Sequence, residues 1–232
     1  MKSKLPRPLV EAAKKVVIPV LRNKWKKHPI VSEWVSQGYI DDEEIDGIVL
    51  NWYIHKKPVP GPHKIKQLTI KELGDEYGCS YLVETGTYRG DMLNAQKDNF
   101  EKLFSIELSE DFWNKAKERF KGVDKINLLQ GDSGKVLPQL APTLDKPTLF
   151  WLDGHYCGGV TALSDIECPI YAELDAVFDN NKNHVVLIDD ARDFVGERDY
   201  PTIAELTSYI KNKDSNYDLS VKDDMIRVVY KK

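Results

Sequence analysis

The chain has 232 residues, of which 41% are apolar and 30% charged, a composition typical of a soluble globular protein. Its net charge of −4 excludes a generally basic nucleic-acid-binding protein, although residues 1–70 are basic, with 13 Lys and Arg against 7 Asp and Glu. No apolar run approaches the roughly 20 residues that span a bilayer, so we expect no stable membrane insertion.

The cysteines and the start of the chain point to a cytoplasmic protein. Three cysteines at no framework spacing favour a reducing compartment over a disulfide scaffold. Glu11, Lys14 and Lys15 interrupt the first apolar run, which argues against a signal peptide.

The first part of the chain predicts a helical extension over residues 1–60. Its helical patterns are Leu9–Lys26, Val31–Gln37 and Asp41–Tyr53. Three prolines and a glycine then fall within Lys56–Lys64, where neither a helix nor a central strand can continue. We therefore place a second domain at residues 61–232.

The role of the basic extension is open between three alternatives. Apolar residues from Leu9 to Leu21 recur at helical spacing, with lysines outside the stripe. Such a helix can pack on the following domain, form a substrate-facing lid or a homodimer contact, or attach weakly to an anionic membrane surface.

After residue 61, helical and strand patterns alternate. The expected helices are 67–78, 91–100, 109–122 (with Ser109 as N-cap), 134–140, 164–180 and 200–213. The expected strands are 80–85, 102–108, 126–132, 148–153 and 184–190, followed by two strands in 217–232 with a turn near Asp223–Asp224. Five strands separated by helices predict an α/β fold, a mostly parallel sheet covered on both faces, with a hairpin at one edge.

Each of the five strands closes with an acid. These acids are Glu84, Glu107, Asp132, Asp153 and the pair Asp189–Asp190. Acids are common in turns and caps, which accounts for one or two of them. Five on one rim of a parallel sheet favour a cation, or a ligand rich in hydroxyls and amines.

The turn after the first strand suggests a nucleoside-containing cofactor. Gly86 allows a sharp turn, and Gly90 allows the next helix to pack closely. Glu107 follows Gly86 by 21 residues, where an acid can accept hydrogen bonds from a ribose. A dinucleotide is disfavoured because Thr87 and Tyr88 crowd the place of a pyrophosphate. S-adenosylmethionine carries no phosphate, and Glu84 suits its ammonium.

Four motifs, "VETGTYRGD", "FSIELSE", "LLQGDS" and "LFWLDGHY", resemble in order and spacing those of class I S-adenosylmethionine-dependent methyltransferases. The resemblance implies a Rossmann-like seven-stranded sheet with an antiparallel last strand. It also implies that Gly86 lies under the methionine part, Glu107 holds the ribose, and Asp132 with Ser133 flanks the adenine. Tyr88 departs from the family pattern by replacing its middle glycine. The cofactor-binding residues expected are Glu84, Thr85, Gly86, Thr87, Tyr88, Gly90, Glu107, Leu108, Gly131, Asp132, Ser133 and Asp153.

The last two acidic strand ends suggest metal chemistry. Asp153, Asp189 and Asp190 resemble the Mg²⁺ ligands of catechol and macrolide-sugar O-methyltransferases, and their oxygen atoms suit Mg²⁺ or Mn²⁺. The alternative is that Asp189 and Asp190 are turn and cap residues. Arg192, beside them, either faces the substrate or neutralises two acids.

His155, two residues after Asp153, is the candidate general base, because neutral imidazole accepts a proton near pH 7. The catalytic residues expected are therefore His155 and, as a metal ligand, Asp153. His155 can equally be a hydrogen-bonded loop residue. Zinc binding by His155, Cys157 and Cys168 is disfavoured, since no Cys-x-x-Cys pair supports it.

These features predict an S-adenosylmethionine-dependent O-methyltransferase acting on a small hydroxylated acceptor, either sugar-like or a natural product. The alternatives are a non-catalytic S-adenosylmethionine-binding protein and an NAD-dependent oxidoreductase. A nucleic-acid substrate is not expected, because residues 71–232 are acidic and "LDGH" stands where base methyltransferases carry an "NPPY"-like motif.

Overall fold

The computed structural model describes residues 49, 52, 55–154, 168–180 and 182–232. The chain divides into two compact units, Met1–Leu68 and Thr69–Lys232. The helices predicted before residue 54 lie outside the described residues except at Val49 and Trp52. The boundary at residue 60 therefore remains a prediction.

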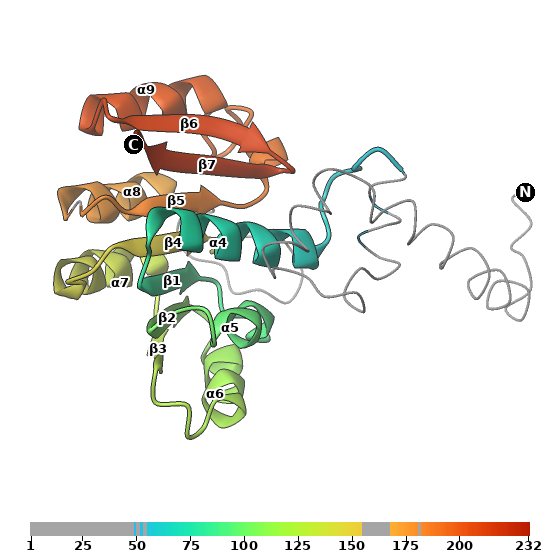
Figure 1. Ribbon diagram of the computed structural model, residues 1–232, viewed down its shortest axis with the longest axis vertical. Coiled ribbons are helices and arrows are strands. Elements are labelled where there is room, and N and C mark those ends of the chain that lie inside the picture. Colours follow the sequence, from blue (N-terminus) through green and yellow to red (C-terminus); the bar gives the residue numbers. More distant parts are fainter. Residues whose placement is uncertain (1–48, 50–51, 53–54, 155–167, 181) are drawn as a thin grey trace, which may run out of the picture. The chain divides into compact units, whose positions relative to one another are not determined.

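The second unit contains one seven-stranded sheet, as expected (Figure 1). Its strands are β1 (Tyr81–Thr85), β2 (Lys102–Glu107), β3 (Ile126–Gln130), β4 (Thr148–Leu152), β5 (Val185–Ile188), β6 (Tyr217–Lys222) and β7 (Met225–Tyr230). The strand order is β3-β2-β1-β4-β5-β7-β6. β1 to β5 pair in parallel, and β7 runs antiparallel to both β5 and β6. The predicted sheet with its closing hairpin is confirmed.

Helices cover both faces of this sheet. They are α4 (His63–Tyr77), α5 (Asp91–Gln96), α6 (Glu110–Arg119), α7 (Ser133–Leu140), α8 (Ile170–Asp179) and α9 (Ile203–Lys213), with short 3₁₀ helices η1 (Ala141–Thr143) and η2 (Ala191–Asp193). Figure 1 shows α5 and α6 on one side of the strands and α7, α8 and α9 on the other. β1, β4 and β5 are buried along their whole length, because central parallel strands are covered on both faces.

Two helix starts show how local chemistry sets the element boundaries. Ser109 is the N-cap of α6, as predicted, and its side chain accepts from the N–H of Phe112. α8 starts at Ile170, later than the predicted residue 164, with Pro169 as its N-cap. Within the described residues, no helix has both the length and the apolar character needed to cross a membrane.

Candidate functional site

The carboxyl ends of β1 and β4 form the switch point of the sheet. β1 pairs with β2 on one side and with β4 on the other, so the chain leaves these two ends in opposite directions. Gly86 follows β1 with φ of 86°, and a Cβ there would lie 2.6 Å from the carbonyl oxygen of Asp153. The turn therefore needs glycine both for its conformation and for the close approach of the β4 end.

The hydroxyl of Thr85 joins these two strand ends. Its Oγ1 accepts the N–H of Asp153 at 3.2 Å and the N–H of Gly154 at 3.1 Å. Gly154 has little room, because a Cβ there would lie 3.0 Å from Thr85 Oγ1 and 3.3 Å from Ser133 Oγ. The backbone after β4 is thus held by a side chain of β1.

Glu84 lies on the opposite face of β1 and is 2% exposed. Ser105 Oγ donates to its Oε2 at 3.0 Å, and Thr87 Oγ1 lies 2.6 Å from Ser105 Oγ. The pKa of Glu84 is raised to about 8, first by burial and then by the nearby carboxylates of Glu107 and Asp91, against the hydrogen bond from Ser105, which lowers it. A bound cation beside Glu84 would favour the ionised form.

Glu107, at the end of β2, holds two backbone segments. Its Oε2 accepts the N–H of Tyr88 at 2.7 Å, and its Oε1 accepts the N–H of Ser109 at 2.8 Å. A carboxylate oxygen has a second lone pair, so Glu107 can still accept hydrogen bonds from ligand hydroxyls. Tyr88 has φ of 47°, a left-handed conformation that suits the glycine it replaces.

Asp132 caps α7, its Oδ1 accepting the N–H of Gly134 at 2.9 Å and its Oδ2 lying 3.4 Å from Lys135 Nζ. Gly131 before it has φ of 144°, and a Cβ there would lie 2.8 Å from Val136 Cγ2. Ser133 is buried, and Leu108 is half-buried beyond β2. Asp132, which follows β3, therefore serves as the cap of α7, and the side chains of Ser133 and Leu108 lie near the edge of the sheet.

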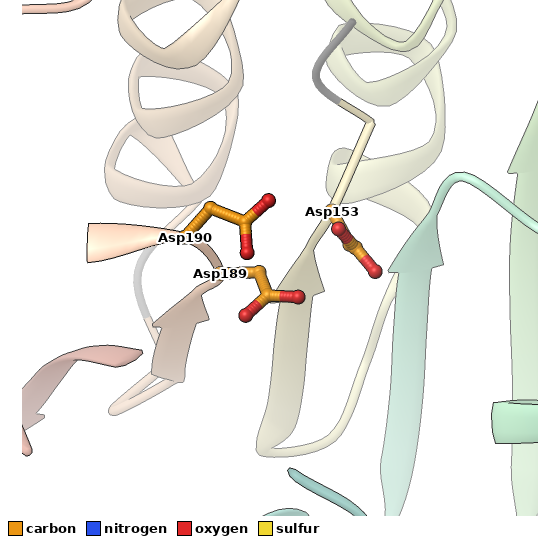
Figure 2. A group of neighbouring side chains, drawn as sticks. All are labelled: Asp153, Asp189 and Asp190. Atoms are coloured by element: carbon orange, nitrogen blue, oxygen red, sulfur yellow. The ribbon is translucent and has the colours of Figure 1, made fainter. Parts of the chain in front are cut away.

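Asp153, Asp189 and Asp190 come together at the ends of β4 and β5 (Figure 2). One carboxylate oxygen from each lies within 4.8 Å of the others. Asp189 is 1% exposed, and Asp190 has φ of 53°, a left-handed conformation. Three neighbouring carboxylates repel one another, and a divalent cation would offset that repulsion.

No protein-family model matches the chain, and no curated protein sequence does. Solved structures match it at low identity. The SAH-bound methyltransferase PaMTH1 of Podospora anserina is 15% identical, with a TM-score of 0.52 over 88% of this chain and 97% of its own. An O-methyltransferase of Bacillus cereus in complex with SAH is 13% identical, with a TM-score of 0.52 over 90% and 100%. Cofactor-bound Rv0187 from MTB is 12% identical, with a TM-score of 0.52 over 75% and 83%.

The chain has the fold of class I S-adenosylmethionine-dependent methyltransferases. In this methyltransferase fold the expected residues gather at one edge of the sheet. Glu84, Gly86 and Thr87 belong to the end of β1 and its turn, and Glu107 contacts that turn through the N–H of Tyr88. Their contact with a cofactor remains a prediction.

Arg192 pairs with Asp190 of the acidic cluster and with Asp224, which is distant from it in the sequence. Its Nη1 donates to Asp190 Oδ1 at 2.8 Å and to Asp224 Oδ2, and its N–H donates to Asp224 Oδ1 at 3.1 Å. Burial lowers the pKa of Arg192, but the ion pairs with Asp190 and Asp224 outweigh it and raise the pKa overall. The sequence placed Arg192 beside two acids, but it did not indicate that Arg192 also pairs with Asp224, in the β6–β7 turn.

The candidate base His155 and Cys157 lie outside the described residues, so their roles stay predictions. Cys168 is described; burial raises the pKa of its thiol to about 12, which keeps it protonated at neutral pH. A further acid, Glu173 in α8, is fully buried beside the site and was not singled out from the sequence. Its spacing held a signal, because Glu173 falls on the apolar stripe with Ile170 and Val177.

Proposed function

We propose that this protein transfers the methyl group of S-adenosylmethionine to a hydroxyl of a small acceptor, assisted by Mg²⁺ or Mn²⁺. The convergence of Asp153, Asp189 and Asp190 carries the proposal. This acidic cluster adjoins the turn at Gly86, because Asp153 belongs to the strand end that contacts this glycine. A cofactor site and a cation site would thus share one residue.

The cofactor would lie across the ends of β1, β2 and β3. Glu84 would face the methionine ammonium, directly or through water, and would ionise there. Glu107 would accept from the ribose hydroxyls with the lone pairs that its two backbone contacts leave. Asp132 and Ser133 would flank the adenine.

The donor set of the acidic cluster fits a hard divalent cation, since it offers carboxylate oxygens alone. Asp190 would supply one carboxylate oxygen to the cation while Arg192 donates to its Oδ1. When bound, the cation would lower the pKa of an acceptor hydroxyl and orient it. Arg192 would keep the whole cluster from carrying its full negative charge.

His155 would take the proton that the acceptor hydroxyl releases, two residues beyond Asp153 in the chain. The extension at residues 1–60 would shape the acceptor site or a homodimer contact. The acceptor itself would be a sugar-like or natural-product hydroxyl compound, with no nucleic acid involved.

Calorimetric titration with S-adenosylhomocysteine tests the cofactor part of this proposal. We expect one site per chain, and Glu107→Ala should weaken binding by about 1–3 kcal/mol through lost hydrogen bonds to a charged group. Binding of NAD in place of S-adenosylhomocysteine would refute the cofactor assignment.

Methyl transfer is then assayed with catechol and with simple sugars, in Mg²⁺ and in excess EDTA. We expect S-adenosylhomocysteine to form only with the cation present. Cofactor binding without transfer to any acceptor would support the non-catalytic alternative.

A further inference from the structure

Glu173 is a buried acid to which the proposed reaction gives no role. It lies in the first turn of α8 and is 0% exposed. Neither carboxylate oxygen has a hydrogen-bond partner among the described residues. A buried polar group without partners costs on the order of 1–3 kcal/mol, so its presence calls for a physical reason.

Glu173 lies near the hydroxyls of Ser133 and Thr85 and near the N-terminal ends of α7 and α8. The hydroxyls of Ser133 and Thr85 lower the pKa of its carboxyl, whereas burial, the larger effect, raises it to about 7. The first turns of α7 and α8 pack together, since a Cβ on Gly134 would lie 3.2 Å from Pro169 Cβ. The N-terminal ends of helices favour a negative charge.

Thr85 needs an acceptor for its hydroxyl proton. A hydroxyl has two lone pairs and one proton. The N–H groups of Asp153 and Gly154 occupy the oxygen of Thr85 as donors. The proton of this hydroxyl is left to be donated elsewhere, and the buried carboxylate of Glu173, whose oxygens have no hydrogen-bond partner among the described residues, is the candidate acceptor.

We propose that Glu173 is a positioning residue that accepts hydrogen bonds from the hydroxyls of Thr85 and Ser133 and thereby holds the end of β4 against the turn after β1. Glu173 then acts on Asp153 and Gly154 through Thr85. Its effect on cofactor affinity rests on the proposed function, whereas its effect on the backbone after β4 does not.

Amide hydrogen exchange of Gly154 tests the proposal without any ligand, because this N–H donates to Thr85 Oγ1. In Glu173→Leu we expect exchange at Gly154 to accelerate about tenfold or more, the scale of losing a hydrogen bond to a charged group. The amide of Gly86, which donates to Ile106, serves as the internal reference and should not change. Glu173→Gln keeps one acceptor oxygen and should restore part of the protection.

Thermal unfolding separates positioning from support of the fold. Replacing a buried acid by leucine should leave the midpoint within about 5 °C of the wild type, because apolar replacement of such groups is often neutral. In a Thr85→Val background, Glu173→Leu should add no further acceleration at Gly154 if it acts through Thr85. If the leucine variant does not fold, the glutamine variant is compared in the same two backgrounds.

S-adenosylhomocysteine affinity is the second readout. We expect about tenfold weaker binding in Glu173→Leu. Asp175→Asn, on the same helix but paired with Lys213 at 2.6 Å, is the matched control and should bind like the wild type. Unchanged exchange at Gly154 in Glu173→Leu, or additive effects with Thr85→Val, would overturn the positioning role. A wild-type protein that fails to bind S-adenosylhomocysteine would refute the proposed function but leave the exchange test decisive for Glu173.

Discussion

Gly86 and Asp153 approach so closely that a Cβ on Gly86 would lie 2.6 Å from the carbonyl oxygen of Asp153. This close approach joins the carboxyl ends of β1 and β4, between which the strand order of the sheet reverses. It explains why the turn after β1 keeps this glycine, although Tyr88 replaces the next glycine of the family pattern.

Gly86→Ala should destabilise the protein by about 2–4 kcal/mol, from left-handed strain and overpacking together. Gly122→Ala is the matched control, since Gly122 has φ of 81° and a Cβ there would meet no atom within 4 Å. This control should lose only the strain, about 1–2 kcal/mol. Urea unfolding measures both, and equal losses would mean that the contact with Asp153 relaxes freely.

Glu84 makes cofactor binding depend on pH. Because burial first, and then the charges of Glu107 and Asp91, raise the pKa of Glu84 to about 8, the free protein is mostly protonated there at pH 7. An ammonium needs the ionised form, so binding should release about one proton and should tighten from pH 6 to pH 8 before levelling off. Titrating S-adenosylhomocysteine in buffers of different ionisation heat counts this proton. Glu84→Gln should bind more weakly and release none; proton release in that variant would point to another group.

His184 should make the fold sensitive to acid. Its Nδ1 accepts the N–H of Thr148 at 3.1 Å, and burial lowers its pKa to about 4. Between pH 6.5 and 4 the unfolded chain binds a proton that the folded protein excludes, so stability should fall by up to about 3 kcal/mol as the pH drops through this window. Above pH 6.5 His184 should not contribute to the change of stability with pH.

Unfolding in denaturant at several pH values measures the slope due to His184. His184→Gln should be less stable at pH 7 but should show a shallower decline toward pH 4. His63→Gln, at an exposed position in α4, is the control and should follow the wild type. A wild-type slope that persists in His184→Gln would assign the acid sensitivity to other groups.

The sequence predicted the sheet and the acidic rim because both depend on local patterns. Apolar runs separated by helices give parallel strands, and parallel strands bring their carboxyl ends to one edge. Glu84, Glu107 and Asp153 could therefore be placed on one rim from the order of the strands alone. The same reasoning could not show that Glu107 binds the N–H of Tyr88, because that contact depends on the path of the turn.

The sequence could not predict which residues far apart in the chain would pair with each other. Asp224 is 32 residues from Arg192, and only the docking of the β6–β7 hairpin beside β5 brings them together. Glu173 is different, because the helical spacing of the sequence does indicate that it lies on an apolar stripe. A single acid on such a stripe does not reveal which hydroxyls it will face.

The acidic cluster should bind a divalent cation that stabilises the folded protein. Asp153, Asp189 and Asp190 place carboxylate oxygens within 4.8 Å of one another, where like charges repel, and Arg192 donates to Asp190. Mn²⁺ should therefore raise the unfolding temperature, by mass action on the folded state. Asp189→Asn should remove most of that rise, whereas Asp111→Asn, an exposed acid in α6, should keep it.

Turnover gives the second measurement on the acidic cluster. Asp189→Asn should lower methyl transfer far more than it weakens S-adenosylhomocysteine binding, because Asp189 would act on the acceptor side of the site. His155→Ala should lower turnover by roughly 10²–10⁴-fold if His155 is the base. Full activity in excess EDTA, together with equal Mn²⁺ effects on the wild type and Asp189→Asn, would leave Asp189 and Asp190 as turn residues. The acceptor hydroxyl would then have to lose its proton to His155 without help from a cation.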